Sequence, residues 1–194
     1  MDDFESNVLA SGDRVILRDH LPSDVDCLIR WQTHGEWRKF DAPWEGVIKS
    51  MTPKEIVTFR KRFLESCEQE LPVPRKRAII ATPENKPLGW VNHHTNERFS
   101  DVWSIGIDIC EDEFIDQGIG TEALRLWIQY LFTNSNIHRI GLDTWSFNPR
   151  MMRVAEKLRF IYEGIQRELV EWQGKRLDLV HYGMLRREWK DMEI

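Results

Sequence analysis

The sequence predicts a mixed α/β fold built on a mostly antiparallel sheet of about seven strands. Three observations support this prediction. Short apolar runs of strand length alternate with helical patterns of apolar residues along the chain. Turn sequences at 83–87 and 173–176 join neighbouring runs, as in antiparallel hairpins. Two glycines, Gly118 and Gly120, stand between one strand and the helix that follows it.

Length and composition are those of an ordinary globular domain. The chain has 194 residues, of which 41% are apolar and 30% charged, so we expect one domain over residues 1–194. Its apolar runs are shorter than the roughly eighteen residues of a membrane helix, which argues against a membrane protein. The net charge of −5 argues against nucleic-acid binding. Three scattered cysteines fit the reducing cytoplasm and match no metal-ligand spacing, so no metal is expected.

The first half of the chain is expected to contain two helices among its strands. Ser23 is a suitable N-cap for a helix that runs to about Trp31. Thr52 and Glu55 form a capping box at the start of a second helix, which ends near Cys67. Strands are expected at Val15–Arg18, Ala78–Thr82, Leu88–His94 and Trp103–Ile109.

The second half is expected to hold two more helices and three more strands. The helix after the glycines carries Leu124, Ile128 and Leu131 on one face. Asn148 and Pro149 start a further helix. Strands are expected at Ile137–Thr144, Ile165–Trp172 and Leu177–Leu185, the last two as a hairpin.

The segment Trp31–Gly46 mixes aromatic and acidic residues without a clear period. It can be a loop that its aromatic rings pin to the core. It can also form a wall of a substrate pocket, in which Trp31, Trp37 and Glu36 contact an amine through cation–π and charge interactions. The two interpretations are compatible, and we keep these three residues as candidate substrate contacts.

The stretch Gln117–Ala123 predicts an anion site between a strand and a helix. Glycines let the backbone approach a ligand, and the free N–H groups at the start of a helix favour a phosphate. A Walker A loop would need Gly-Lys-Ser/Thr at its end, which this stretch lacks. A dinucleotide fingerprint fits Gly118 and Gly120 and places Asp143 about twenty residues on. Residues 110–117, however, separate these glycines from the end of the strand.

Two stretches of the chain resemble motifs of one known family. Ile105–Ile109, followed by Phe114–Ala123, resembles the pyrophosphate loop of the GNAT acetyltransferase superfamily. The resemblance is closest to the branch of ribosomal-protein N-terminal acetyltransferases, in which this motif typically ends in Gly-x-Gly-Thr-Glu-Ala, as here. Ser146–Phe160 resembles a second family motif, and the order of elements from Val15 to Leu185 is the GNAT order. The resemblance implies a GNAT-like sheet with helices on both faces and acetyl-CoA as the cofactor.

The chain also departs from the family pattern. Ile115 and Asp116 stand where many members have Arg or Gln followed by Gly, and Arg159 replaces a usual glycine. Met151 stands where relatives in the same branch often have a serine. Ala155 stands where other branches have a tyrosine that protonates the departing thiolate. The cofactor motif is therefore present, while the usual general acid is missing at both family positions.

The resemblance implies where the cofactor binds. Ile107 and Ile109, at the end of their strand, would pair with the pantetheine arm. This pairing requires the strand to splay from its neighbour at Ile140–Thr144. Asn148 is the family position that commonly contacts the same arm, and it is equally suited to cap a helix. The pyrophosphate would be held by the backbone N–H groups of Gln117, Gly118, Ile119, Gly120 and Thr121.

An amine must lose a proton before it attacks, so the reaction needs a base. Asp143 is the first candidate, because some relatives carry a glutamate base in the corresponding strand. Asp108 is the second candidate, because an acid within an apolar strand needs a reason. Each of them can instead be a structural hydrogen-bond partner. His93 and His94 are further candidates, although such residues are more often hydrogen-bonded core or edge histidines.

We therefore predict an acetyl-CoA-dependent N-acetyltransferase that transfers the acetyl group directly to a primary amine. The acceptor is a small molecule or a protein N-terminus, and a homodimer is left open. No cysteine stands in a sequence context that suggests a covalent acetyl-enzyme. A non-catalytic acyl-CoA-binding module is the alternative, because the general acid is missing. A nucleotide-binding oxidoreductase is a weaker alternative.

Overall fold

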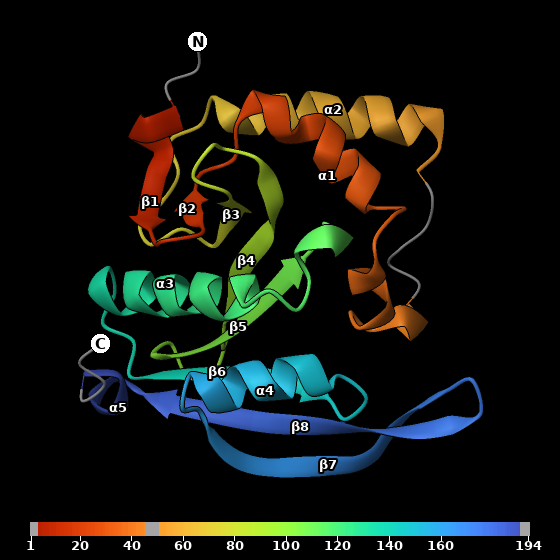
Figure 1. Ribbon diagram of the computed structural model, residues 1–194, viewed down its shortest axis with the longest axis vertical. Helices are drawn as coiled ribbons and strands as arrows, with labels where there is room; N and C mark the ends of the chain where they lie inside the picture. Colours follow the sequence, from red (N-terminus) through yellow and green to blue (C-terminus); the bar gives the residue numbers. More distant parts are fainter. Residues whose placement is uncertain (1–3, 46–50, 191–194) are drawn as a thin grey trace.

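Eight strands form one sheet that runs through the molecule (Figure 1). The computed structural model describes residues 4–45 and 51–190. The spatial order of the strands is β1-β2-β3-β4-β5-β6-β8-β7, and neighbours are antiparallel except β5 and β6, which are parallel. The strands are β1 (Val8–Ser11), β2 (Ile16–Arg18), β3 (Arg77–Ala81), β4 (Pro87–Thr95), β5 (Val102–Ile109), β6 (Arg139–Trp145), β7 (Ile161–Trp172) and β8 (Lys175–Leu185).

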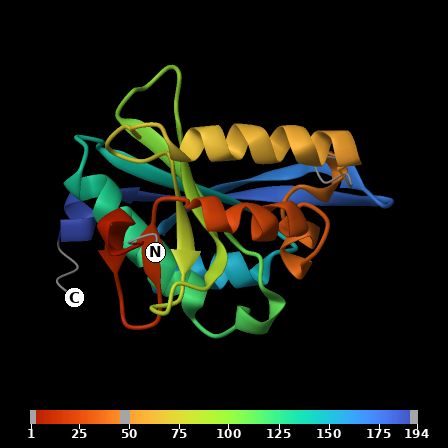
Figure 2. The ribbon, with the colours of Figure 1, turned by 90° about the horizontal axis from the view of Figure 1, so that it is seen from above.

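Helices cover both faces of this sheet (Figure 2). The first pair, α1 (Val25–Trp31) and α2 (Pro53–Cys67), packs on one face. The second pair, α3 (Ile119–Thr133) and α4 (Pro149–Lys157), packs on the other. Short 3₁₀ turns are η1 (Phe4–Asn7), η2 (Pro22–Asp24), η3 (Glu36–Lys39), η4 (Pro43–Glu45) and η5 (Asp112–Phe114). In the part of the chain that the structure describes, no helix has the length and apolar character to cross a membrane.

The two faces carry separate apolar cores because side chains alternate along each strand. In β3, Ala78 and Ile80 belong to the core under α3, whereas Ile79 and Ala81 belong to the core under α1. Both sets are buried, so β3 is a central strand with an uninterrupted apolar sequence. A polar side chain within such strands is therefore forced toward one core or the other.

The parallel pair β5–β6 separates soon after it begins. Its register is Val102↔Arg139, Trp103↔Ile140 and Ser104↔Gly141, and no pairing follows among the described residues. β5 stays paired with β4 on its other side as far as Ile109. β6 likewise stays paired with β8 as far as Trp145. The sheet is thus held together on both sides of an opening, as the sequence analysis required.

The predicted fold class is confirmed, and all seven expected strands form with small shifts of their ends. One strand was not predicted: β1 is short, and a register shift interrupts its pairing with β2. The predicted N-cap Ser23 was wrong, because it lies within the 3₁₀ turn Pro22–Asp24 and α1 begins only at Val25. The Asp24 side chain accepts the Leu21 N–H at 2.7 Å and pairs with the buried Arg18. Gly46, the last residue of the aromatic and acidic segment, lies outside the described residues.

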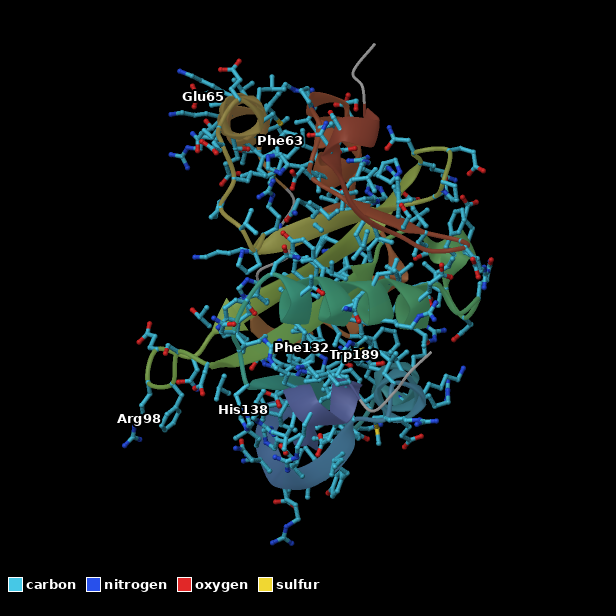
Figure 3. The ribbon with its side chains drawn as sticks, turned by 90° about the vertical axis from the view of Figure 1, so that its left-hand side faces the viewer. Phe63, Glu65, Arg98, Phe132, His138 and Trp189 are labelled. Atoms are coloured by element: carbon cyan, nitrogen blue, oxygen red, sulfur yellow. The ribbon has the colours of Figure 1, made fainter. Side chains whose placement is uncertain are left out.

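A short C-terminal helix, α5 (Arg186–Lys190), was also not predicted. Figure 3 shows Trp189 of α5 beside Phe132 of α3, and their ring centroids are 6.4 Å apart. The Trp189 indole N–H donates to the Gln129 side chain at 2.7 Å. A helix of this length is too short to be stable on propensity alone, so these tertiary contacts account for it.

Candidate active site

A cavity of about 390 Å³ opens where β5 and β6 separate. Its walls come from the ends of both strands, the turn before α3, the start of α4 and the segment between α1 and α2. Of the thirteen candidate residues from the sequence, ten line it: Asp143, Asp108, Ile107, Ile109, Gly118, Ile119, Gly120, Thr121, Asn148 and Trp37. Gln117, Trp31 and Glu36 are not among the lining residues.

The turn before α3 leaves several backbone donors free at one end of the cavity. Gly118 has φ +83°, a left-handed conformation that strains residues with a side chain. Within the described residues, the N–H groups of 117–120 donate to no backbone carbonyl. The Thr121 N–H instead donates to the Gly118 carbonyl at 3.1 Å. The predicted anion site therefore offers four backbone N–H groups without a backbone partner in the described residues, together with the dipole of a fifteen-residue helix.

Arg14, in the turn between β1 and β2, adds a positive charge beside this turn. Its guanidinium donates to the Gln117 carbonyl, and its backbone N–H donates to the Glu122 carboxylate at 2.9 Å. The Gln117 side chain in turn donates to the Glu113 carbonyl. These contacts fix the turn in place before any ligand arrives. The contribution of Arg14 was missed because its partners lie more than a hundred positions away in the sequence.

The open edge of β5 presents backbone groups to the cavity. The Asp101 carbonyl accepts from His138 and Arg139, so this residue faces β6. The Cys110 N–H donates to Leu88, so that residue faces β4. Because backbone groups alternate along a strand, those of Ile107 and Ile109 face the opening. An extended ligand with amide groups can therefore add to this edge like a strand.

Asn148 lies on the opposite side of the opening, at the start of α4. Its side-chain oxygen accepts the Met151 N–H at 3.1 Å, which caps the helix. Asn148 also lines the cavity, and its side-chain N–H₂ group has no hydrogen-bond partner among the described residues and can donate to a ligand. The capping and the ligand-contact interpretations of this residue are thus compatible in one geometry.

Asp108 is a strongly perturbed acid of the cavity. It pairs with Trp90 across β4 and β5 and points away from the core under α3. Burial raises the pKa of Asp108 to about 7, and the Asp41 carboxylate adds to the rise. Arg77 and a hydrogen bond from Trp90 partly oppose this change. A carboxyl with a pKa near neutrality, at a cavity wall, is suited to accept a proton.

Asp143 lines the same cavity from β6 in a different environment. Its side chain is 48% exposed. The His181 Nδ1 group donates to the Asp143 carboxylate at 2.8 Å from the neighbouring strand β8. The His181 Nε2 atom is buried and has no hydrogen-bond partner in the described residues, so the contact with Asp143 is the side-chain hydrogen bond that orients this ring. No pattern in the sequence points to His181 as a site residue.

The three candidate substrate contacts have different positions. Trp31 is fully buried, and its indole N–H donates to Glu111 at 2.9 Å. It belongs to the α1–α2 core and does not reach the cavity. Trp37 does line the cavity and also packs edge-on against Trp90, with centroids 5.2 Å apart. Glu36 lies outside the lining and bonds Lys39 at 2.8 Å.

The remaining candidate acids and bases are mostly elsewhere. His93 is buried and stacks on Trp103 at 4.1 Å; burial lowers its pKa to about 4. His94 is exposed and does line the cavity. Burial raises the pKa of the Cys110 thiol far above its usual range, so it is a poor nucleophile. Among the described residues, no Tyr, Ser or Cys lines the cavity, and no acidic, His and Cys group could hold a metal.

Several lining residues were not singled out from the sequence. Asp41 and Asn92 add polar groups from the α1–α2 segment and β4. Arg150, Arg153 and Lys157 of α4 also line the cavity. The spacing of these three cations, three and four residues apart, places them on one helix face and is a signal that the sequence does contain.

Comparison with known proteins identifies the family. The model of the acetyltransferase (GNAT) domain matches residues 14–161. The chain belongs to the GNAT family. The predicted family is thereby confirmed, and the acetyl-CoA cofactor of GNAT enzymes fits the free donors and the open strand edge described above.

Relatives and solved structures agree with this membership. YdaF of Bacillus subtilis, whose name describes a ribosomal N-acetyltransferase, is 31% identical over 53% of this GNAT chain and 55% of its own length. The chain thus aligns with about half of that relative. A GNAT acetyltransferase from Bacillus anthracis has the same fold, with a TM-score of 0.70 and 18% identity over 92% of this chain and 99% of that one. Spermidine N-acetyltransferase from Vibrio cholerae, solved with CoA and spermine, gives a TM-score of 0.69 and 16% identity over 91% and 98%.

Proposed function

We propose that this chain is an acetyl-CoA-dependent N-acetyltransferase that transfers the acetyl group directly to a primary amine, with Asp108 as the general base. The observation that carries the proposal is the position of Asp108. Asp108 is a desolvated carboxyl with a raised pKa. It lies at the opening between β5 and β6, in the same cavity as the turn that is proposed to bind the anion. Asp143 was the first candidate base from the sequence, but the environment of Asp108 is better suited to a base that works near neutral pH.

Each part of the chain has a role in this scheme. The donors at 117–120 hold the pyrophosphate, and the open edge of β5 orients the arm that carries the acetyl group. Acetyl-CoA supplies the reactive thioester. Asp108 accepts a proton from the acceptor ammonium, and the neutral amine then attacks the thioester carbonyl. The nitrogen carries an extra proton once it has attacked the carbonyl, and the departing thiolate takes this proton, so the step needs no separate general acid.

The acceptor that this cavity favours is a cationic amine. Asp41, Asp108 and Asp143 lie on its walls together with the rings of Trp37 and Phe40. Carboxylates and aromatic faces together attract an ammonium group. Both a small polyamine, as for the Vibrio cholerae neighbour, and a protein N-terminus meet this requirement. A homodimer stays a prediction, which sedimentation analysis checks.

The test is an acetylation screen with acetyl-CoA, small amines and peptides with free N-termini. Release of CoA thiol together with acetylated acceptor is expected. CoA binding without acceptor-dependent thiol release across both acceptor classes would favour the non-catalytic binding module. Gly120→Glu is the control that locates the cofactor, because it adds bulk and negative charge at the phosphate donors and should abolish CoA binding in calorimetry. Unchanged CoA affinity in this variant would move the cofactor site elsewhere.

A further inference from the structure

Asp116 places a carboxylate in the turn that is proposed to bind pyrophosphate. Its φ is +60°, a left-handed conformation that glycine adopts at lower cost. A residue with a negative side chain therefore occupies a position where both backbone strain and electrostatics favour glycine. The side chain lines the cavity one residue before the free donors of 117–120.

Arg150 of α4 pairs with this carboxylate. Its Nε atom is 3.1 Å from Asp116 Oδ2, and its side chain lines the same cavity. Two further contacts fix the guanidinium from the acceptor side. It lies over the Phe40 ring at 5.5 Å, and Nη1 is 3.8 Å from Glu36 Oε2. The Glu36 N–H is itself bound to Asp112 at 2.7 Å, so the residue that helps position Arg150 is anchored to the chain before the turn.

The charges explain why this pairing matters for an anionic ligand. An uncompensated carboxylate beside bound pyrophosphate would repel it, and the repulsion would be weakly screened where the ligand excludes water. In the ligand-free protein the pair is weaker, because the Arg150 side chain is 36% exposed and that of Asp116 is 58% exposed. The ion pair therefore contributes little to the stability of the ligand-free protein and mainly to the affinity for an anion in the turn.

We propose that Arg150 is a charge-compensating residue for Asp116, and that it sets CoA affinity by cancelling the negative charge that this chain carries in its phosphate-binding turn. The proposal rests on the proposed function, since it needs CoA at this turn. It assigns Arg150 a role that differs from that of a cation binding phosphate directly. The contribution of Arg150 to CoA affinity depends on the presence of the Asp116 carboxylate.

The test is a double-mutant cycle on CoA affinity, measured by calorimetry with the full chain. The variants are Arg150→Gln, Asp116→Asn and the double variant. Asparagine tolerates a left-handed conformation, so Asp116→Asn removes the charge with little backbone change. Arg150→Gln is expected to weaken CoA binding about ten-fold in the parent, and about two-fold or less when Asp116 is already Asn. The matched control is Arg153→Gln, a second lining cation of α4 with no ion pair among the described residues, whose effect should not depend on Asp116.

The outcomes separate the inference from the proposed function. Suppose that the parent binds CoA and that Arg150→Gln lowers CoA affinity by the same factor in the parent and in Asp116→Asn. Arg150 then does not compensate Asp116, and the inference fails while the proposed function stands. It fails equally if Arg150→Gln leaves CoA affinity unchanged. If the parent binds no CoA, both the proposed function and the inference are overturned. Melting temperatures of all the variants, including Arg153→Gln in the Asp116→Asn background, identify any loss of affinity that comes from unfolding.

Discussion

Asp108 and Asp143 carry the same functional group on the two strands that border the opening of the candidate active site, yet their surroundings differ. Asp108 lies beside Trp90 and near Asp41, and burial raises its pKa to about 7. Asp143 is half-exposed and accepts a hydrogen bond from His181. Both line one cavity. A sequence that shows two acids in two apolar strands does not distinguish them.

The difference shows that solvation, more than residue type or strand position, decides which carboxyl can act as a base. A carboxylate in water holds its proton too weakly to remove one from an ammonium group near neutral pH. Desolvation makes the charged form costly, so the carboxyl becomes a better proton acceptor. Asp108 meets this condition, whereas Asp143 is better placed to attract or orient a cationic acceptor.

The largest effect is expected from Asp108→Asn. The amide keeps the shape and removes the proton acceptor, so turnover should fall by about 10²- to 10⁴-fold, the usual contribution of a general base. In the parent, kcat/KM should rise with pH through an inflection near pH 7, because the pKa of Asp108 is about 7. The variant should lose this inflection. Steady-state rates from pH 5.5 to about 9 measure both effects.

CoA affinity is the control for this variant, because Asp108 is not expected to contact the phosphates. An unaltered inflection in Asp108→Asn would assign the titration to another group. His94, which also lines the cavity, would then be the next residue to replace.

Trp37→Ala should alter stability and reactivity together. Trp37 is 8% exposed and packs against Trp90, the cross-strand neighbour of Asp108. Loss of this ring should lower the free energy of unfolding by about 3–5 kcal/mol, as for other buried tryptophans. It should also admit water near Asp108 and shift the inflection of the rate profile to lower pH.

Thermal unfolding and the pH profile of the folded fraction measure the two effects of Trp37→Ala separately. A lower melting temperature with an unshifted inflection would mean that Trp37 only packs the core. Trp31→Phe is the matched comparison, because Trp31 is buried in the same core but does not line the cavity. Its rate profile should be unchanged.

Asp108→Asn should also change how stability depends on pH. The folded state keeps the Asp108 proton up to about pH 7, whereas the unfolded chain releases it near its ordinary pKa of 3.8. The folded state therefore binds more protons between these values, and the free energy of unfolding falls as the pH rises through this window. Above pH 7 Asp108 is charged in both states, and the cost of burying this charge lowers the free energy of unfolding by its full amount, on the order of a few kcal/mol. Denaturant titrations should show the variant more stable than the parent at pH 8 and nearly equal at about pH 4. A constant difference across that range would contradict the raised pKa.

The proposed cofactor half of the site stays a prediction, but the backbone geometry that it needs follows from local signals in the sequence. Gly118 needs its left-handed φ, and the glycines stand directly before an amphipathic helix, so the anion site could be read from one short stretch. The proposed pantetheine contact also required β5 and β6 to separate, and the strand register confirms this separation after Ser104↔Gly141.

The acceptor half was less predictable because tertiary contacts build it. Trp31 and Trp37 look alike in the sequence, yet one is buried beside Glu111 and the other reaches the cavity. Asp143 gains its partner His181 from a strand 38 residues away. The strand β1 escaped prediction because four residues with a register shift carry too little alternation to recognise.

Asp143→Asn is expected to have the smallest effect, and it tests the comparison most directly. The carboxylate is half-exposed, so its attraction for an acceptor cation is screened by water and is worth less than about 1 kcal/mol. Turnover at saturating acceptor should stay within about three-fold of the parent, while the acceptor KM rises by about two- to five-fold. CoA affinity should not change. His181→Phe is the companion variant: it removes the donor to Asp143 and should raise the same KM by a similar factor, with no further increase in the double variant. If Asp143→Asn instead lowers turnover by 10²-fold or more and removes the inflection near pH 7, the roles of the two carboxylates must be exchanged.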